Sequence, residues 1–215
     1  IMGRKTKYVS TQGTSIVKVF DMVAGGTGAT EKQLQRLGVK YHKVHVHPSG
    51  HAGYYPGTST MHIKVLFDAK GKILGAQACG YDGVDKRLDV MAAALRSGGT
   101  VYDLEDLELS YAPPFGSAKD PVNMAGFVAG NVLRGDIKLW YAEDYPEATK
   151  DAELVDVRTK DEYDIWHIPG AVHAPLDTIR DVMGSWDKNK KIRLYCGVGF
   201  RSYLAYRALV QSGFK

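Results

Sequence analysis

The stretch Ile192-Arg193-Leu194-Tyr195-Cys196-Gly197-Val198-Gly199-Phe200-Arg201 places a strand, a glycine-containing loop and a helix entry in direct succession. Its first four residues are typical of a buried strand. From Ser202 onward the apolar side chains recur at helical spacing, at Leu204, Ala205, Ala208 and Leu209. The stretch therefore predicts a strand-loop-helix unit with Cys196 at the carboxyl end of a parallel strand, the edge at which open α/β sheets form their ligand crevices.

The loop after Cys196 is predicted to bind an anion. A tight loop with glycines can direct several backbone N–H groups inward, and the N-terminus of the following helix adds partial positive charge. Such a setting lowers the pKa of a thiol and favours the thiolate, which is the nucleophile. We therefore expect Cys196 to be a catalytic nucleophile that can carry a persulfide, held by Gly197, Val198, Gly199, Phe200 and Arg201.

Other chemistries compete for such a loop. A Cys-x5-Arg loop would hold a tetrahedral oxyanion, as in phosphate-ester hydrolysis or arsenate reduction. Here Arg201 follows Cys196 after four intervening residues, and the smaller ring has room for a sulfur atom rather than for a phosphate. Cys196 could also be an inert apolar residue, but buried structural cysteines seldom lie at such a turn. The spacing favours sulfur transfer.

The surrounding sequence predicts two domains. From residue 137 to 215, short apolar runs (138–141, 153–157, 172–174, 191–195) alternate with helix-like stretches (143–149, 159–164, 176–186, 202–212), which indicates an α/β domain with a parallel sheet. Residues 1–133 instead contain a strand at 15–20, a hairpin of 61–67 with 73–79, and helices at 30–38, 84–96 and 122–133. This pattern predicts an α+β domain with an antiparallel sheet and flanking helices. The linker is expected at 131–136.

Composition excludes several classes of function. The net charge of +4 is spread along the chain without a basic block, so we expect no nucleic-acid partner. No apolar stretch is long enough to cross a bilayer, so we expect no membrane association. Two distant cysteines are no disulfide framework, which favours the cytoplasm. The chain starts at Ile1 and stops at a helix C-cap, as a piece of a longer polypeptide would.

Some residues suggest chemistry that their context does not support. His42, His45, His47 and His51 match no standard metal-site spacing, and no cysteine or acidic residue joins them, so we expect no metal. The glycine-rich stretch 24–28 lacks the Lys-Ser/Thr of a phosphate loop and is interpreted as a turn that leads into a helix capped by Thr30. Cys79 lies in an apolar strand and is expected to be buried and unreactive.

The second half of the chain resembles rhodanese domains. Residues 153–176 contain Asp-Val-Arg, Glu-Tyr and His-Ile-Pro-Gly-Ala in the order and spacing of the rhodanese signature, followed by the Cys196 loop. Two departures are Trp166, where the family usually has glycine, and the end of the chain before the family's final strand and helix. The resemblance implies that the domain is truncated at its C-terminus. It also implies that Asp156, Arg158, Glu162 and His167 mainly tie loops together, through salt bridges and hydrogen bonds.

The first half resembles the C-terminal dimerisation domain of CoA-disulfide reductases and related flavin NADH oxidases. Four blocks carry the resemblance: 13–21, 51–57, 83–89 and 111–121. It implies a homodimer in which a tyrosine pair, Tyr54 (with Tyr55 a close second) and Tyr111, reaches into the partner's flavin site. A phenol can hydrogen-bond a thiolate there and stay protonated at neutral pH.

Taken together, the two resemblances imply the C-terminal part of a CoA-disulfide reductase fused to a rhodanese domain. The FAD- and NAD(P)H-binding domains of such a protein precede this region, and the substrate would be CoA disulfide, CoA persulfide or polysulfide. Cys196 would take a sulfane sulfur and pass it to CoA or to the reductase site. The alternative is a catalytically inactive dimerisation and docking module.

Overall fold

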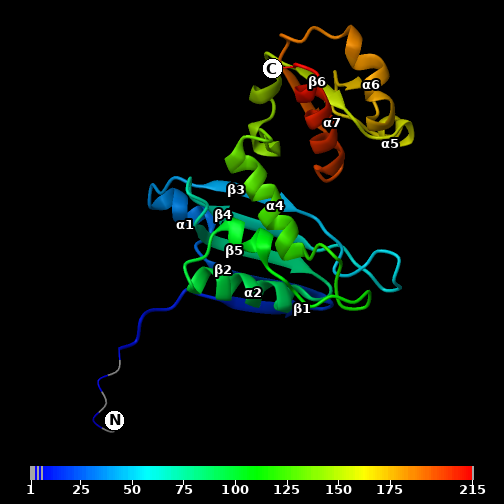
Figure 1. The fold of residues 1–215 in the computed structure, drawn as a ribbon. Helices are drawn as coiled ribbons and strands as arrows, with labels where there is room; N and C mark the ends of the chain where they lie inside the picture. Colours follow the sequence, from blue (N-terminus) through cyan, green and yellow to red (C-terminus); the bar gives the residue numbers. More distant parts are fainter. Residues whose placement is uncertain (1–2, 4, 6, 215) are drawn as a thin grey trace. The chain divides into compact units, whose positions relative to one another are not determined.

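The computed structural model describes residues 3, 5 and 7–214 and divides into two compact units, Ile1–Leu133 and Arg134–Lys215 (Figure 1). The first unit is an α+β domain with an antiparallel sheet, and the second has a parallel sheet. Both halves of the predicted fold class are therefore confirmed. Among the described residues, no helix has the length and apolar character needed to cross a membrane.

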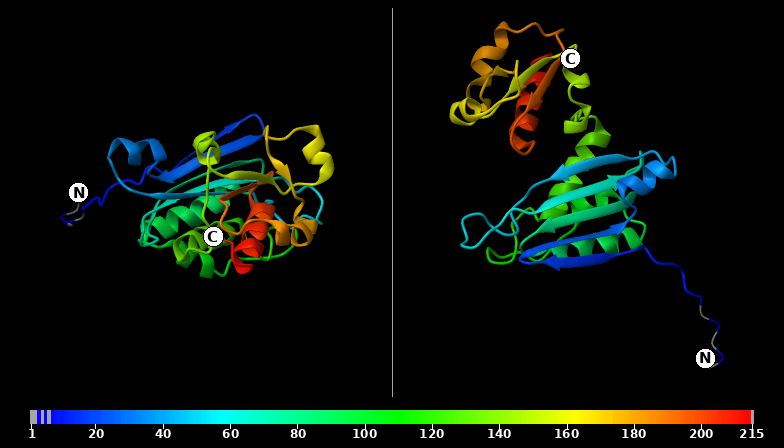
Figure 2. Two further views of the ribbon diagram at one scale, coloured as in Figure 1. Left: turned by 90° about the horizontal axis from the view of Figure 1, so that it is seen from above. Right: turned by 180° about the vertical axis from the view of Figure 1, so that it is seen from behind.

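The first unit is built on a five-stranded antiparallel sheet. Its strand order is β1 (Ser15–Val19), β2 (Met22–Gly28), β5 (Ile73–Gly80), β4 (His62–Phe67) and β3 (His42–Val46). The helices are α1 (Glu31–Arg36), α2 (Val84–Arg96), α3 (Val101–Asp106) and α4 (Pro121–Arg134). Helices α2 and α4 cover one face of the sheet, and α2 packs on β2 and β5 (Figures 1 and 2).

Local sequence explains how α1 begins and where it is held. Thr30 caps the helix, as predicted: its hydroxyl accepts from the Gln33 backbone, and the Gln33 side chain accepts from the Thr30 backbone, which forms a capping box. The Glu31 carboxylate then bonds Lys43 on β3 and Lys64 on β4. One acidic residue in the first turn thus fastens the helix to two strands.

The prediction for the glycine-rich stretch 24–28 was wrong. These residues form most of β2, a strand between β1 and β5, and not a turn. The glycines allow close packing, because a Cβ added at Gly25 would lie 2.6 Å from the Ser15 carbonyl oxygen and 2.7 Å from Leu88 Cδ2 of α2. Strands are usually predicted from alternating apolar and polar residues. Most of β2 is glycine, because larger side chains would clash with its neighbours, so this alternation is missing.

Three further features of the first unit differ from expectation. Helix α3 (Val101–Asp106) was not predicted, although Thr100 and Asp103 form a capping box there. The two units divide at Leu133–Arg134, inside the linker expected at 131–136, but residues 131–134 are helical because α4 continues through Arg134. Cys79 on β5 is only half-buried, contrary to the expectation of a buried residue.

A buried ion pair holds the loops of the first unit together. The Arg87 guanidinium on α2 lies 2.9 Å from the Asp120 carboxylate, and both side chains are at most 5% exposed. Arg87 also donates to the backbone carbonyls of Gly50 (2.8 Å) and Phe115 (3.4 Å). A buried charge of this kind is stable only when paired and hydrogen-bonded. Arg87 therefore joins the loop after β3 to the segment before α4.

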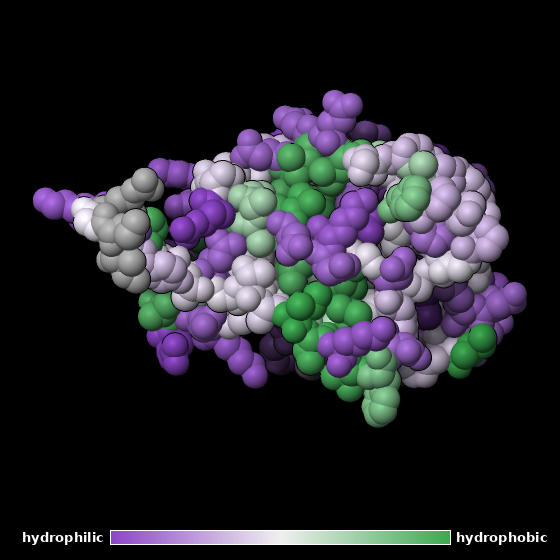
Figure 3. Space-filling model, turned by 90° about the horizontal axis from the view of Figure 1, so that it is seen from below, coloured by the Kyte–Doolittle hydropathy of each residue, from purple (hydrophilic) through white to green (hydrophobic). Residues whose placement is uncertain are grey.

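The β1–β2 hairpin leaves apolar side chains at the surface. All five residues of β1 are exposed, and the apolar side chains of the hairpin include Phe20, which is 94% exposed. The others are Ile16, Val17, Val19 and Met22. Figure 3 shows hydrophobic surface near the centre of the face seen from below, divided by hydrophilic residues. Exposed apolar side chains on an edge strand are typical of an interaction site.

The second unit contains a three-stranded parallel sheet. Its strand order is β7 (Val172–His173), β6 (Glu153–Asp156) and β8 (Ile192–Tyr195). The helices are α5 (Lys160–Ile165), α6 (Ile179–Val182) and α7 (Phe200–Gln211), with short 3-10 turns at Ala142–Asp144, Glu147–Thr149, Leu176–Thr178 and Met183–Ser185. The buried core consists of Val155, Val157, Ala174, Ile179 and Ala205.

Strand-helix alternation located the three strands of this sheet, but two details differ. Residues 138–141 form no strand, and within the described residues β8 pairs with β6 alone. The helix-like stretches 143–149 and 176–186 are broken into short turns and one four-residue helix. Pro146 interrupts the first stretch, and polar residues and Gly184 interrupt the second, so the apolar periodicity did not extend far enough for a regular helix.

The Arg87–Asp120 pair gives a stability prediction. Asp120→Asn keeps the side-chain oxygen that accepts from the Val122 backbone at the start of α4 but removes the charge opposite Arg87. We expect a loss of roughly 3 kcal/mol in the free energy of unfolding, because one partner of a buried pair remains charged. Urea unfolding followed by circular dichroism measures it.

The matched control is Asp89→Asn, a substitution of an exposed aspartate on the same helix as Arg87. It should change the free energy of unfolding by less than about 0.5 kcal/mol. Equal effects of the two substitutions would show that the buried pair does not hold this domain together.

Candidate functional site

Cys196 lies at the turn between β8 and α7. Gly199 is the N-cap of α7 and has a φ of 91°, a left-handed conformation that glycine adopts without strain. The helix begins at Phe200 and not at Ser202 as expected. Arg201 and Ser202 therefore stand in the first helical turn, beside the cysteine rather than beyond it.

The Cys196 sulfur is half-buried and hydrogen-bonded on two sides. The Gly199 backbone N–H donates to Sγ at 3.2 Å, and the Cys196 thiol donates to Ser202 Oγ at 3.7 Å. Burial raises the pKa of the Cys196 thiol, but hydrogen bonds from the backbone and hydroxyl of Ser202 and from the backbones of Val198 and Gly199 outweigh it. The net result is a pKa below the usual value for cysteine, which favours the thiolate.

Sequence reasoning did not single out Ser202 as a site residue. It was assigned only to the start of the helix, whereas its side chain lies against the sulfur and donates to the Gly199 carbonyl oxygen at 2.9 Å. Its position could have indicated this role, because Ser202 directly follows Arg201 and lies in the first turn of the helix that begins at the loop.

Arg201 is bound to an acidic residue of another element. Its Nη1 and Nη2 atoms lie 2.5 and 2.7 Å from the two carboxylate oxygens of Glu162 on α5. Hydrogen bonding to Glu162 raises the pKa of Arg201, and the same bonds lower the pKa of Glu162 well below its usual range. Of the remaining loop residues, Val198 and Phe200 are exposed, at 57% and 61%.

The residues proposed to tie loops together lie beneath this site. Asp156 at the end of β6 is fully buried, and Arg158 binds its carboxylate and donates to the Trp166 carbonyl oxygen at 2.6 Å. Burial raises the pKa of Asp156, but the bonds from Arg158 outweigh it and leave that pKa lowered. The Tyr195 hydroxyl accepts from the Ile168 backbone, and burial raises the pKa of Tyr195 to about 12.

His167 has a similar structural setting. Its ring stacks on Tyr163 with centroids 3.8 Å apart, and its Nδ1 lies 2.9 Å from the Tyr163 carbonyl oxygen. Tyr163 in turn donates to the Ala171 carbonyl oxygen. These contacts organise the segment between α5 and β7, and none of them reaches the Cys196 sulfur.

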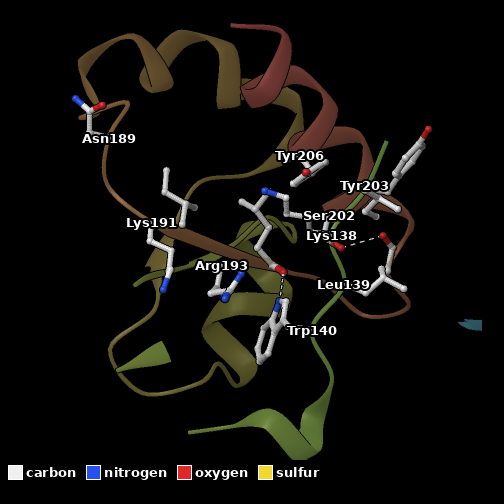
Figure 4. A pocket seen from close by; sticks show the side chains of 13 residues that line it. Lys138, Leu139, Trp140, Asn189, Lys191, Arg193, Ser202, Tyr203 and Tyr206 are labelled. Atoms are coloured by element: carbon white, nitrogen blue, oxygen red, sulfur yellow. Dashed lines mark hydrogen bonds between the residues drawn. The ribbon is translucent and has the colours of Figure 1, made fainter. Parts of the chain in front are cut away.

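A hollow of about 560 Å³ lies along the free edge of β8 (Figure 4). Trp140 stands in it and donates from Nε1 to the Leu194 carbonyl oxygen at 2.9 Å. Gly199 and Ser202 border the hollow together with Lys138, Arg193, Tyr203 and Tyr206. The Cys196 side chain is not part of its lining.

In the first unit the structure brings two of the three predicted tyrosines together. The hydroxyl groups of Tyr54 and Tyr111 are 3.4 Å apart, and the side chains are 78% and 50% exposed. The hydrogen bond with Tyr111 raises the pKa of Tyr54 above its usual value. Tyr55 instead packs edge-on against the ring of His51. Of the three predicted tyrosines, Tyr54 and Tyr111 are therefore the hydrogen-bonded pair.

The histidines of the first unit do not gather into a metal centre in the described part of the chain, where no group of three or more potential ligands occurs. His47 Nδ1 lies 2.7 Å from His62 Nδ1, a neighbour that the sequence had not suggested. His51 is buried.

Family comparisons cover both units. A model of the pyridine nucleotide-disulphide oxidoreductase dimerisation domain matches residues 14–121, half of the chain, and a model of the rhodanese-like domain matches residues 132–215. The chain belongs to the pyridine nucleotide-disulphide oxidoreductase family. Its dimerisation domain is followed by a rhodanese-like domain, as both resemblances indicated.

Individual proteins are similar to one or both units. A coenzyme A disulfide reductase of Staphylococcus haemolyticus is 42% identical over 118 residues, which is 54% of this chain and 26% of that protein. The crystal structure of reduced CoADR-RHD from Bacillus anthracis is 45% identical, with a TM-score of 0.94, over 97% of this chain and 38% of that one.

An NAD-dependent persulfide reductase from A. fulgidus has a TM-score of 0.85 at 30% identity and covers 99% of this chain and 38% of that one. The chain thus spans only about a quarter to two-fifths of the length of these relatives. This region is homologous to the same region of CoA-disulfide and persulfide reductases.

The cofactors that the family implies do not fit the described residues. A dinucleotide site needs a parallel β-α-β unit whose glycine turn meets a helix N-terminus. The glycine-rich stretch of the first unit instead lies inside antiparallel β2. In the second unit, the corresponding turn holds the Cys196 sulfur. No step of the chemistry in this chain is therefore assigned to a flavin or a nicotinamide.

The hydrogen bonds around the sulfur predict the pH dependence of its reactivity. In a Cys79→Ser background, iodoacetamide alkylation of Cys196 should reach half its maximal rate below pH 8.5, the ordinary thiol pKa. Ser202→Ala should move that midpoint to higher pH. The backbone and the hydroxyl of Ser202 both lower the pKa of Cys196, and the substitution removes the hydroxyl. The measurement is the rate of alkylation against pH.

A midpoint at or above the ordinary thiol value in the unsubstituted loop would contradict this account of the site. The difference between the midpoints of the unsubstituted loop and the Ser202→Ala variant is a second test, and it does not depend on the reference pKa chosen for a free thiol.

Proposed function

We propose that this chain is a sulfurtransferase module of a larger CoA-disulfide, CoA-persulfide or polysulfide reductase, with the transferable sulfur carried on Cys196. The observation that supports it most directly is the Cys196 sulfur itself, half-buried at a helix N-terminus with the Gly199 N–H at 3.2 Å. Rhodanese-like relatives over the same residues support the same chemistry.

The reaction consists of two displacements. The Cys196 thiolate attacks the sulfane sulfur of a donor such as thiosulfate; the donor S–S bond breaks, sulfite leaves with the bonding electrons, and a cysteine persulfide forms. An acceptor thiolate such as CoA then attacks the outer sulfur, which yields the acceptor persulfide and restores the Cys196 thiolate. Neither step needs a metal or a redox cofactor, and the loop amides stabilise the anion in both.

In the larger protein, we propose that FAD and NAD(P)H supply the electrons that reduce the disulfide or persulfide. There, this chain would contribute the hydroxyl groups of Tyr54 and Tyr111 as hydrogen-bond donors. The two hydroxyls, 3.4 Å apart and exposed, can donate together to a sulfur anion. The raised pKa of Tyr54 keeps its phenol protonated at neutral pH, so it remains a hydrogen-bond donor.

Transfer activity is tested with thiosulfate as donor and cyanide or CoA as acceptor. Cys196→Ser should lower the rate of transfer to background, because the hydroxyl does not form a persulfide. Cys79→Ser, the control at the other cysteine, should keep the rate. If the unsubstituted chain transfers no sulfur, then the alternative holds, in which the chain is a docking and dimerisation module without activity.

Self-association follows from the family of the first unit and from its exposed apolar hairpin. We expect a homodimer, and static light scattering should report twice the 23.6 kDa mass of one chain. Phe20→Lys introduces a charge into the exposed apolar side chains and should shift the equilibrium toward monomer. A strictly monomeric chain at all concentrations would count against the cross-subunit role of the tyrosine pair.

A further inference from the structure

The two loops that carry the tyrosine pair are joined through their backbones. Tyr54 lies in one turn, and Tyr111 directly precedes another. The Ala52 N–H, two residues before Tyr54, donates to the carbonyl oxygen of Gly116, five residues after Tyr111, at 2.9 Å. The relative placement of the two loops therefore decides where the two phenols lie.

The Arg87 guanidinium binds both of these loops. Its Nη2 atom donates to the Gly50 carbonyl oxygen at 2.8 Å and to the Phe115 carbonyl oxygen at 3.4 Å, and each carbonyl lies four residues from one of the paired tyrosines. The same nitrogen lies 2.9 Å from the Asp120 carboxylate. Arg87 is 2% exposed, so these groups are its partners in place of water.

The surroundings of Arg87 suit a guanidinium. Gly83, the N-cap of α2, has a φ of 66°, and a Cβ added there would lie 2.2 Å from Arg87 Nη1. This nitrogen donates to the Gly83 carbonyl oxygen at 3.4 Å. A planar group with five donors can reach a carboxylate and the carbonyls of separate loops at once, whereas the lysine ammonium places all its donors on one nitrogen.

The contact between the two tyrosines needs such support. The side chains of Tyr54 and Tyr111 are 78% and 50% exposed, and their hydroxyls are 3.4 Å apart. A hydrogen bond between exposed groups replaces bonds to water and contributes little on its own, and ordering the two side chains costs entropy. The spacing of the hydroxyls must therefore be set mainly by the backbone beneath them.

We propose that Arg87 is a positioning residue for the Tyr54–Tyr111 pair, which sets the distance between the two hydroxyls through the loops that carry them. The inference rests on the proposed role of this pair as donors to a sulfur anion and extends it to the group that fixes their geometry. Asp120 holds the guanidinium and also accepts from the Val122 N–H at the start of α4. Without the guanidinium, the carbonyls of both loops lose their shared donor, so the loops and their hydroxyls can move apart.

The first test is the pKa of Tyr54 in the whole chain, followed by the carbon NMR signal of isotope-labelled tyrosine and assigned with Tyr54→Phe. In the unsubstituted chain, the hydrogen bond with Tyr111 raises this pKa. Arg87→Lys keeps a positive charge opposite Asp120 but does not reach both loop carbonyls, so the pKa should fall toward the ordinary value of about 10. Tyr111→Phe, which removes the partner hydroxyl, should cause the same fall.

The second test measures proximity at neutral pH by photo-oxidative cross-linking, which couples adjacent tyrosines to dityrosine. Mass spectrometry of the digested chain should find peptides joined through Tyr54 and Tyr111. Arg87→Lys should lose most of this cross-link. Asp120→Asn should lose part of it, because the guanidinium remains but no longer faces a carboxylate charge.

Val65→Ala is the control for a loss of stability alone. It opens a cavity at a fully buried position of β4, so it should destabilise the domain but leave the Tyr54 pKa and the cross-link unchanged. Every variant is measured at a temperature at which circular dichroism shows it to be folded. A Tyr54 pKa and a cross-link that stay unchanged in Arg87→Lys and Asp120→Asn would overturn the proposal. Neither measurement needs a sulfur donor or a flavin, so a failure of the proposed function would show up separately, in the transfer and self-association assays.

Discussion

The hydrogen bond from the Gly199 N–H to the Cys196 sulfur sets the geometry on which the candidate site depends. It exists because Gly199 adopts a φ of 91° as the N-cap of α7, a conformation that would cost a residue with a side chain roughly 1–2 kcal/mol. That turn brings the first helical N–H groups to the sulfur and places Ser202 and Arg201 around it. The parallel sheet below provides the fixed strand end from which the loop departs.

In each unit, ion pairs hold loops in place near the candidate site residues. In the second, the Glu162–Arg201 pair joins α5 to the helix that follows the Cys196 loop, and the Asp156–Arg158 pair lies at the end of β6, the strand next to β8. In the first, the buried Arg87–Asp120 pair joins segments whose exposed tyrosines then meet. In both units ion pairs organise loops, while the groups proposed to contact sulfur remain accessible to solvent. Positioning and reactivity are carried by different residues.

Much of this architecture could be predicted from local sequence patterns. The strands β6 and β8, the capping box at Thr30 and the position of Cys196 after a strand all depend on neighbouring residues, whose preferences the sequence shows directly. Strand β2 was missed because its glycines serve close packing against α2 and leave no apolar alternation.

Contacts between distant residues were out of reach of the same reasoning. Tyr54 and Tyr111 are 57 positions apart, and Glu162 and Arg201 are 39 apart. Family resemblance named the tyrosines, yet only the folded chain decides between Tyr54 and Tyr55 as the partner of Tyr111.

The central claim concerns a bond that forms on Cys196, and mass spectrometry of the chain after exposure to thiosulfate tests it most directly. The account predicts a peptide containing Cys196 that is heavier by one sulfur atom and returns to its original mass with cyanide. An unmodified Cys196 peptide, or the added sulfur on Cys79 instead, would contradict it.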